Sequence, residues 1–481
     1  MEQDVVIWVI LAGLAERILA ISVTLHAVLN KRDTRAVIGW VGLAWLAPVL
    51  GSFAYFWFGI NRIRRNRSVR KRKGRWEASR AAGNHRTDGE ALHLPHESAH
   101  LGGLIRLSDR IAQQPLTAGN RIEPLMNGDE TFPSMLDAIR NAHYSITLLS
   151  YIFECDETGY EFLKELSAAV ARGVQVRVLI DDVGSRYGHS NIISELNAAG
   201  VRAAAFLPTR IPRIPQYANL RNHRKILVVD GHIGFTGGTN IRHSHVLGDN
   251  PSYPTACTHF RVQGPVVDHM QEVFAFDWEF TTGEKLTGSP WFETHVQCGN
   301  TWARGISHGP DEDFEKLTQV LAGALSVAER RVRILTPYFL PEVSLIQALN
   351  LAALRGVKVE ILVPEQNNVV LVQWAMQAQL WQNLERGCRI WFVPPPFDHS
   401  KLMVVDDVWT LLGSTNWDPR SLRLNFEFNI ECYDVDLAAK VNRIIDDKAT
   451  LAREITLTEV DSRSTLTRIR DGICRLAIPY L

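Results

Sequence analysis

The stretches SITLLSYIF (residues 145–153) and VRILTPYFL (residues 332–340) share one pattern, and this pattern decides the fold. Both are short and rich in branched and aromatic residues, which predicts buried strands. Each is followed by a helical stretch and then by an Arg-Gly-Val turn, at Arg172 or Arg355, that opens a second apolar strand. A third strand follows in each copy. The repeat therefore predicts an α/β protein with two tandem α/β/α units, related by a pseudo-twofold axis, each with a largely parallel core.

The bulk composition agrees with two such units. The chain has 481 residues with 52 basic and 52 acidic side chains, so its formal net charge is zero. Its length predicts at least two domains, which we place at 116–290 and 291–481. A neutral balance argues against a general polyanion binder. The six cysteines form no Cys-x-x-C pair, which argues against a disulfide framework or zinc ribbon and favours a reducing compartment.

Each unit contains the same polar motif, within residues 217–244 and 393–420. The first copy is NHRKILVVD, followed by GGTN, and the second is DHSKLMVVD, followed by GSTN. His, Lys and Asp keep the same offsets, and six residues separate Asp from the glycine-rich turn in both copies. Two copies on repeated units make a specific pattern. The candidate catalytic residues are His223, Lys225, Asp230, His399, Lys401 and Asp406.

The spacing of this motif indicates phosphoryl-transfer chemistry. Side chains two apart on a strand, such as His223 and Lys225, lie on the same face, and the intervening residue points away. Lys binds phosphate as a point charge, and His acts as a nucleophile or as a general acid and base. One His cannot easily do both, but two facing copies can. We expect no metal and no cofactor, because two lysines and nearby amides can carry the phosphate charge.

With these motifs, the chain resembles the phospholipase D superfamily and, within it, the bacterial cardiolipin synthases. The resemblance covers nearly the whole chain and includes TPYF at 336–339 and the run from Trp417 to Glu427. It implies a two-step mechanism in which one His forms a phosphohistidine intermediate and the other acts as acid and then base. By similarity, His223 is the nucleophile and His399 the acid and base, although the spacing itself does not assign these roles.

The resemblance also implies supporting roles. Glu427 matches a family carboxylate that orients a catalytic His through its second ring nitrogen, the alternative being a solvated strand residue. Asp230 and Asp406 lie farther along the strand, which favours a role in fixing local structure. Ser414 and Gly238 occupy equivalent positions in the two glycine-rich turns. The residues that would hold the phosphate oxygens are Lys225, Lys401, Asn240 and Asn416.

The first unit departs from the family pattern at one position. Many relatives have an Asp four residues before the Arg that corresponds to Arg261, and this chain has Cys257 there. The first turn also has Gly238 where the second has Ser414. These changes leave open what orients the second His. Cys257 as a nucleophile is a weak alternative.

The N-terminal segment 1–62 predicts a membrane hairpin. Residues 37–60 carry no charge, and a helix of about 20 residues crosses a core of roughly 30 Å. We take this as the strongest span, with Pro48 tolerated as a kink. Residues 5–29 form the second candidate helix, although Glu16 and its basic neighbour lie in its middle. The alternative is one span with a surface helix.

A basic and His-rich linker is predicted at 63–115. Its basic run, between Arg62 and Arg75, places the catalytic units on the cytoplasmic side of a bacterial inner membrane by the positive-inside rule. The run would also attract anionic lipid, unless it only sets topology. Three histidines suggest a metal site, but a solvated linker is the better interpretation, because no carboxylates stand at ligand spacing. These histidines are His93, His96 and His100.

The C-terminal segment shows apolar residues at helical spacing with arginines among them. This predicts either a membrane-surface helix or a helix packed on the domain. The apolar residues are Leu466, Ile469, Ile473 and Leu476, and the arginines are Arg468, Arg470 and Arg475.

Together these features favour a phosphatidyltransferase that joins two phosphatidylglycerol molecules into cardiolipin and glycerol, with phosphatidylglycerol and anionic membrane lipid as its partners. Alternatives are a hydrolytic phospholipase D or a transferase with another donor or alcohol. A membrane-tethered, metal-independent nuclease is less favoured, because the chain is neutral and lacks a basic groove interleaved with aromatic residues, so no nucleic acid is expected. A non-enzymatic scaffold is improbable with both motifs intact.

Overall fold

The computed structural model describes residues 2–31, 34–59, 96–112, 114–187, 190–208, 219–293, 297–311 and 313–476. The chain forms two compact units. One is Met1–Ile63 with Pro208–Leu220, and the other is Arg64–Leu207 with Arg221–Leu481. The second unit contains both sequence repeats. The basic run, His93 and the side chain of His96 lie outside the described residues.

The N-terminal unit is helical. Helix α1 (Glu2–Asn30) covers the predicted helix at 5–29, and its Asp4–Asn30 part is, within the described residues, the one helix long and apolar enough to cross a membrane. The predicted continuous helix at 37–60 is wrong. It is divided into α2 (Thr34–Leu46), α3 (Pro48–Ala54) and the π-helix η1 (Tyr55–Gly59).

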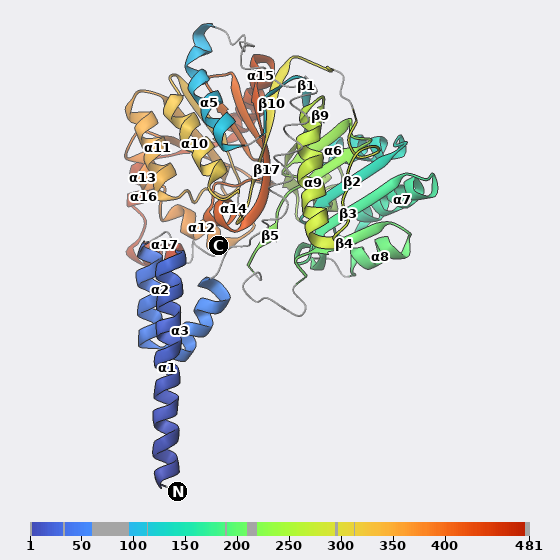
Figure 1. Cartoon of the computed structure of the whole chain (residues 1–481). Coiled ribbons are helices and arrows are strands. Elements are labelled where there is room, and N and C mark those ends of the chain that lie inside the picture. The colour runs from blue at the N-terminus through green and yellow to red at the C-terminus, as the bar shows by residue number, and fades with distance from the viewer. Residues whose placement is uncertain are drawn as a thin grey trace. The chain divides into compact units, whose positions relative to one another are not determined.

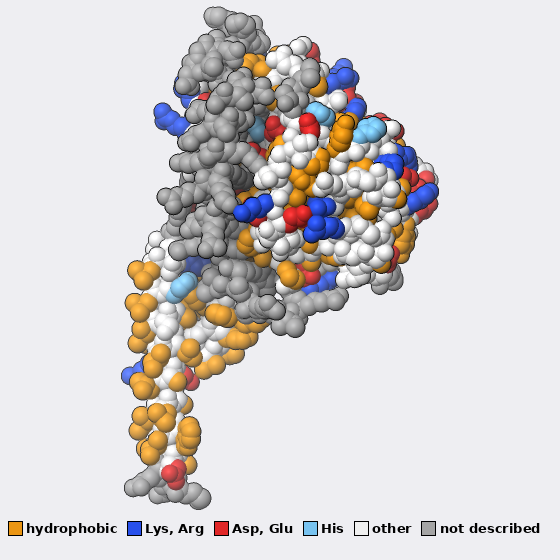
Figure 2. Space-filling model, turned by 45° about the vertical axis from the view of Figure 1, so that its right-hand side comes forward, with side chains coloured by type: hydrophobic (Ala, Val, Ile, Leu, Met, Phe, Trp, Pro, Cys, Tyr) orange, Lys and Arg blue, Asp and Glu red, His pale blue; other side chains and the backbone are white. Residues whose placement is uncertain are grey.

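Pro48 explains this division. Its ring disfavours the helical conformation at the preceding residue, and Ala47 has φ −141° and ψ 77°. The chain then folds back on α1, where Tyr55 packs beside Ala27 and its hydroxyl lies 2.8 Å from Nδ1 of His26. Figure 2 shows hydrophobic side chains over the surface of these helices.

The first half of the second unit alternates strands and helices as the repeat predicts (Figure 1). Its strands are β1 (Thr117–Met126), β2 (Ser145–Ser150), β3 (Gln175–Asp181), β4 (Arg202–Phe206), β5 (Arg221–Asn222), β6 (Ile226–Val229), β7 (Ile233–Gly237), β8 (Thr255–Ala256) and β9 (Thr258–Gln263). Its helices are α6 (Asn127–Arg140), α7 (Glu157–Ala171), α8 (Ile192–Ala198) and α9 (Val266–Thr282), with short 3-10 turns η3 (Gly184–Arg186), η5 (His243–His245) and η6 (Leu247–Asp249).

The second half repeats this order. Its strands are β10 (Thr301–His308), β11 (Arg331–Leu335), β12 (Lys358–Pro364), β13 (Arg389–Val393), β14 (Phe397–Asp398), β15 (Leu402–Val405), β16 (Trp409–Gly413), β17 (Asn425–Tyr433) and β18 (Arg453–Ile455). Its helices are α10 (Lys316–Val327), α11 (Val343–Leu354), α12 (Val370–Gln377), α13 (Trp381–Leu384), α14 (Pro419–Arg423), α15 (Val435–Leu451), α16 (Leu457–Asp461) and α17 (Thr465–Leu476).

The sheet topology shows the pseudo-twofold relation directly. The first half has the order β1-β9-β7-β6-β2-β3-β4, and the second has β10-β17-β16-β15-β11-β12-β13. The halves join through antiparallel pairing of β1 with β10. Only β2-β3-β4 and β11-β12-β13 are parallel among these strands, so the expectation of a largely parallel core is wrong for the others. Tight turns such as β6–β7 can only join antiparallel neighbours.

The predicted linker at 63–115 extends too far. After the 3-10 helix η2 (His96–Leu101), helix α5 (Gly102–Ile111) buries Leu104 and Ile105 in the hydrophobic core of the second half. His100 is not a solvated linker residue, because its Nε2 lies 2.7 Å from the carboxylate of Asp406. The sequence favoured a linker here because the apolar residues of this helix are surrounded in the sequence by polar and His residues.

Asp406 anchors the start of β11. It has a positive φ of 50°, and its carboxylate accepts hydrogen bonds of 2.8 Å from the backbone N–H groups of Glu329, Arg330 and Arg331. Asp230 does the same for the residues at the start of β2, with three bonds of 2.7–2.8 Å. These contacts hold the hairpin that follows each His-x-Lys segment to its neighbour in the sheet.

Replacing Asp406 by alanine is therefore expected to destabilise the second half by about 3 kcal/mol, because several backbone donors lose a charged acceptor. The midpoint of thermal unfolding of the purified protein in detergent measures this. The exposed Asp461→Ala variant is the control. An unchanged midpoint in Asp406→Ala would show that water replaces the carboxylate without loss.

Candidate active site

Each His-x-Lys segment crosses to the opposite half of the unit. The short strand β5 pairs with β17, and the N–H of His223 donates to the carbonyl of Phe426 at 2.9 Å. In the same way β14 pairs with β8, and the N–H of His399 donates to the carbonyl of Ala256 at 2.7 Å. This reciprocal pairing brings the two predicted motifs into one site at the interface of the halves.

The two histidines face each other in this site. Their ring centroids are 6.3 Å apart, and each residue is 7% exposed. Between His223 and Lys225, Arg224 points away as predicted, and its guanidinium lies 2.5 Å from the carboxylate of Asp277. Burial favours the neutral form of both histidines. Burial lowers the pKa of His223 to about 4 and lowers the pKa of His399 well below its usual value.

Both lysines lie beside the histidines. The Nζ of Lys225 donates to the carbonyl of His223 at 2.8 Å, and the Nζ of Lys401 donates to the carbonyl of His399 at 2.5 Å. Burial lowers the pKa of Lys225 to about 7 and that of Lys401 to about 8. An anion placed between the histidines would favour the protonated forms of both lysines, whose surroundings hold little water.

Glu427 orients His223. Its carboxylate is fully buried and lies 2.9 Å from Nδ1 of His223, and the hydroxyl of Ser414 donates to it at 2.5 Å. Burial raises the pKa of Glu427, but His223 and Lys225 outweigh this and hold it below its usual range. An ionised Glu427 requires a proton on Nδ1, which leaves Nε2 of His223 with a free lone pair. The alternative of a solvated strand residue is wrong, because this side chain is buried.

His399 is oriented differently, which answers what replaces the missing acid. The strand register places Cys257 where the other half has Glu427, since Gly237 pairs with His259 as Gly413 pairs with Asn429. The Nδ1 of His399 lies 2.9 Å from the backbone carbonyl of Gly238, and not on the thiol.

Gly238 has to be glycine for this contact. A Cβ atom there would lie 2.5 Å from the carbonyl oxygen of His399 and 2.6 Å from Sγ of Cys257. The two halves therefore differ at two neighbouring positions at once. The half with Glu427 has Ser414 in its turn, and the half with Cys257 has Gly238, whose carbonyl contacts His399.

Two tyrosines complete the site, and the sequence analysis did not single them out. The ring of Tyr151 lies 4.9 Å from the ring of His223 and 5.3 Å from Nζ of Lys225. The ring of Tyr338 lies 6.3 Å from the ring of His399. Both tyrosines occupy the same position of the repeated strand pattern, which could have indicated a role in the site. A tyrosine at that position also fits a buried strand, so the pattern alone did not distinguish the two.

The remaining predicted residues fall into two groups. Asn240 and Asn416 are buried in the glycine-rich turns, where Asn240 accepts from the N–H of Ile152 at 3.3 Å and Asn416 donates to Ser421 at 3.1 Å. Asp230 and Asp406 follow the far ends of β6 and β15 and bind backbone N–H groups. Their candidate catalytic assignment is therefore not supported by their position, which favours the structural role.

Comparison with known proteins agrees with this duplicated site. The family described as "Cardiolipin synthase, PLD-like domain" matches residues 135–278 and 321–448. The cardiolipin synthase of Geobacillus kaustophilus is 32% identical over 98% of this chain and 94% of its own length. The major cardiolipin synthase of Bacillus subtilis is 32% identical over 94% of this chain and 95% of its own length. This chain belongs to the cardiolipin synthase family.

The fold of this family member also matches a solved structure. The phosphatidylserine synthase of Haemophilus influenzae superposes with a TM-score of 0.60 at 17% identity, over 79% of this chain and the whole of that chain. At this identity the likeness concerns the fold alone. It agrees with the observed mixed α/β sheet built from two phospholipase D-like halves.

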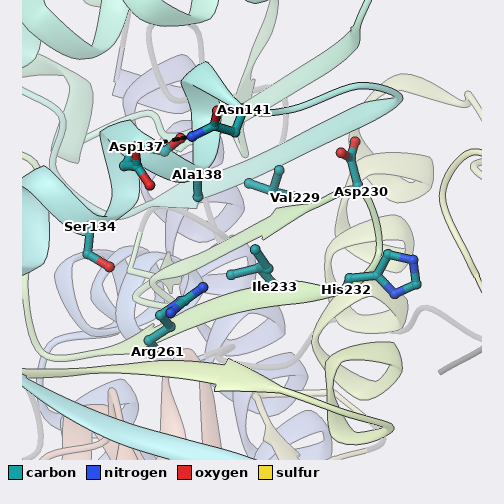
Figure 3. A pocket seen from close by; sticks show the side chains of 9 residues that line it. All are labelled: Ser134, Asp137, Ala138, Asn141, Val229, Asp230, His232, Ile233 and Arg261. Carbon is teal, nitrogen blue, oxygen red and sulfur yellow. Dashed lines mark hydrogen bonds between the residues drawn. The ribbon is translucent and has the colours of Figure 1, made fainter. Parts of the chain in front are cut away.

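A cavity of about 370 Å³ lies elsewhere in this cardiolipin synthase family member. Figure 3 shows it lined from helix α6 and strands β6, β7 and β9, with the amide of Asn141 donating to Asp137 at 3.1 Å. Of the candidate site residues only Asp230 borders it, and that carboxylate binds backbone N–H groups. Among the described residues no group of three or more His, Cys, Asp or Glu side chains is arranged to hold a metal ion.

Proposed function

We propose that this protein is a cardiolipin synthase that transfers a phosphatidyl group from one phosphatidylglycerol to a second, giving cardiolipin and glycerol. The observation that supports it is the pair of facing histidines between two buried lysines, with a carboxylate behind only one of them. Names of relatives along the whole chain support the same substrate class. Phosphatidylglycerol and anionic lipid are the partners we assign, and nucleic acid is not.

In the first step, Nε2 of His223 attacks the phosphorus of phosphatidylglycerol. A P–N bond forms, the P–O bond to the glycerol headgroup breaks, and His399 gives its proton to the departing oxygen. The bound phosphodiester supplies the negative charge that favours protonated His399 in a site where burial otherwise keeps it neutral. Glycerol leaves, and a phosphatidyl-histidine remains on His223.

In the second step, neutral His399 takes the proton from a glycerol hydroxyl of another phosphatidylglycerol. That oxygen attacks phosphorus, a P–O bond forms, and the P–N bond to His223 breaks. Cardiolipin is released, and both histidines return to their starting forms. Lys225 and Lys401, with Asn240 and Asn416, are assigned to the non-bridging phosphate oxygens.

The unequal partners of the two histidines support the assignment of His223 as nucleophile. The phosphorylated imidazole carries positive charge, and the carboxylate of Glu427 beside Nδ1 stabilises it. His399 has only the neutral carbonyl of Gly238 behind it, so its protonated form is a stronger acid. A stronger acid at the leaving oxygen and a better-supported nucleophile on the opposite side fit the two roles.

Helix α1, which is long and apolar enough to cross a membrane, supports the proposed location in a bacterial inner membrane. The basic run after residue 61 is proposed to keep the catalytic unit on the cytoplasmic side. The test of function is product analysis. Purified protein in detergent is incubated with phosphatidylglycerol alone, and cardiolipin and glycerol are expected in equal amounts. Phosphatidic acid with glycerol, and no cardiolipin, would identify a hydrolase, and absence of all three products would contradict the proposal.

The activity is expected to fall as pH rises above about 7 to 8, because Lys225 and Lys401 bind phosphate only while protonated and burial lowers their pKa values into this range. Values of kcat/KM measured from pH 5.5 to 9.5 report the ionisation of the free enzyme. Intrinsic tryptophan fluorescence checks folding across the range. A profile that keeps rising past pH 9 would contradict a role for these lysines as phosphate-binding cations.

A further inference from the structure

Helix α17 turns its apolar side to solvent. Leu466, Ile469, Ile473 and Leu476 are 80%, 53%, 62% and 80% exposed. At 3.6 residues per turn, these four side chains lie within an arc of roughly 80°. The helix does pack on the domain, as one of the two sequence-based alternatives has it, but through the side opposite this stripe.

The buried side of α17 is polar. Asp471 is fully buried and lies 2.8 Å from the guanidinium of Arg463 and 2.7 Å from that of Arg470. Arg463 also donates to the backbone carbonyl of Gln377 in α12 at 2.8 Å, and the guanidinium of Arg470 lies 4.2 Å from the ring of Trp374. These contacts fasten α17 to α12 with its apolar stripe outward, which reverses the usual arrangement of a surface helix.

Further exposed apolar side chains lie at the start of α12, on the active-site side of this helix. Val369, Val370 and Leu371, at the start of α12, are 40%, 53% and 49% exposed. The residue before them, Asn368, accepts a hydrogen bond of 2.8 Å from the hydroxyl of Tyr338. The ring of Tyr338 in turn lies 6.3 Å from that of His399. Exposed apolar side chains therefore lie both on the C-terminal helix and, on the helix that it packs against, close to a candidate catalytic His.

The exposed charge on α17 is cationic. Arg468, Arg470 and Arg475 are exposed, whereas Asp471, which is the helix's one acidic residue, is buried and paired. An apolar stripe flanked by arginines matches an anionic bilayer, which offers acyl chains beneath phosphate groups. A protein partner would require complementary acidic groups around an apolar patch, and a second copy of this surface would oppose arginine to arginine.

We propose that α17 and the start of α12 form a docking surface that lies in the interface of an anionic phospholipid bilayer and brings the active site to lipid headgroups. This rests on the proposed function, because it assigns the substrate's own membrane as the occupant. The apolar side chains would enter the acyl boundary, and the arginines would meet headgroup phosphates. Docking would then let a headgroup reach His223 and His399 while its acyl chains stay in the bilayer.

The test compares two forms of one substrate with the full-length protein. A variant with Leu466→Ser, Ile469→Ser and Ile473→Ser is assayed on phosphatidylglycerol vesicles after reconstitution and on short-chain phosphatidylglycerol dissolved below its micelle concentration. We expect at least a tenfold loss of kcat/KM on vesicles and a change of less than about twofold on the dissolved lipid. The matched control is Leu351→Ser with Leu354→Ser, which removes leucines that are 59% and 64% exposed on α11, a helix without arginine. This control should keep its kcat/KM on both vesicles and dissolved lipid.

A second measurement reports the position of α17 without using activity. A polarity-sensitive fluorophore is attached to Ile473→Cys in a background without Cys155, Cys298 and Cys474. Its fluorescence emission should shift to the blue in vesicles containing phosphatidylglycerol. The shift should be smaller in vesicles of phosphatidylcholine alone and should weaken in Arg468→Gln with Arg475→Gln.

Three outcomes would overturn the docking surface. The first is a fluorophore that remains water-exposed in anionic vesicles. The second is an equal loss of activity on both forms of the lipid. The third is a blue shift in detergent that depends on protein concentration, which would indicate a second copy. If the unmodified protein makes no cardiolipin from either form, the proposed function fails, but the fluorophore still tests docking.

Discussion

Replacing His223 or His399 by alanine is expected to lower cardiolipin formation by a factor of about 10³ or more, because each supplies a function that the other cannot supply at the same time. The rings face each other at 6.3 Å, so removal of either leaves a facing imidazole without its counterpart. The exposed His143→Ala variant is the control. Residual turnover near that of the unmodified protein in either variant would contradict a shared site.

The two variants are also expected to differ from each other. With His399→Ala, attack by His223 can still occur slowly, and a phosphatidyl group should accumulate on the protein. With His223→Ala, no such covalent species should form. Mass spectrometry of each variant after mixing with phosphatidylglycerol locates the modified residue. A phosphatidyl group on His399 would keep the two-step chemistry but reverse the roles assigned here.

The duplicated pattern made much of this site predictable. The expectation that His and Lys lie on one strand is wrong in detail, because residues 223–225 lie between β5 and β6 and residues 399–401 lie between β14 and β15. The repeat of the same spacing nevertheless predicts two equivalent segments. The apolar strands quoted at 145–153 and 332–340 are β2 and β11, which pair with β6 and β15, the strands that follow the two His-x-Lys segments. These features depend on local sequence, because short runs of branched and aromatic residues predict buried strands.

The features that the sequence could not predict involve backbone groups, which every residue has, or contacts between residues far apart in the sequence. The acceptor for His399 is a backbone carbonyl, which any residue possesses, and only the Cβ contacts at Gly238 show why glycine is needed there. His100 reaches Asp406 across 306 positions. The break at Ala47 was predictable in principle, because Pro48 restricts the residue before it, but apolar composition alone favoured one long helix.

Replacing Glu427 by glutamine is expected to lower kcat roughly 10²-fold or more with little change in KM. Glutamine has nearly the same shape, but its amide can donate to Nδ1 of His223. The ring proton then moves to Nε2, and the lone pair that attacks phosphorus is lost. Because Glu427 is buried behind the ring and is assigned no contact with phosphate, lipid binding should persist. Glu427→Asp should restore part of kcat, since it restores the charge.

The structure offers a matched control for Glu427 at Cys257, the equivalent position in the other half. Cys257→Ala should keep kcat within about twofold, equivalent to roughly 0.5 kcal/mol, because Nδ1 of His399 donates to the carbonyl of Gly238 and not to the thiol. Equal losses in Glu427→Gln and Cys257→Ala would mean that the two positions do the same work. A loss confined to Glu427→Gln would mean that the two halves, although alike in fold, hold their histidines by different groups and so commit them to different steps.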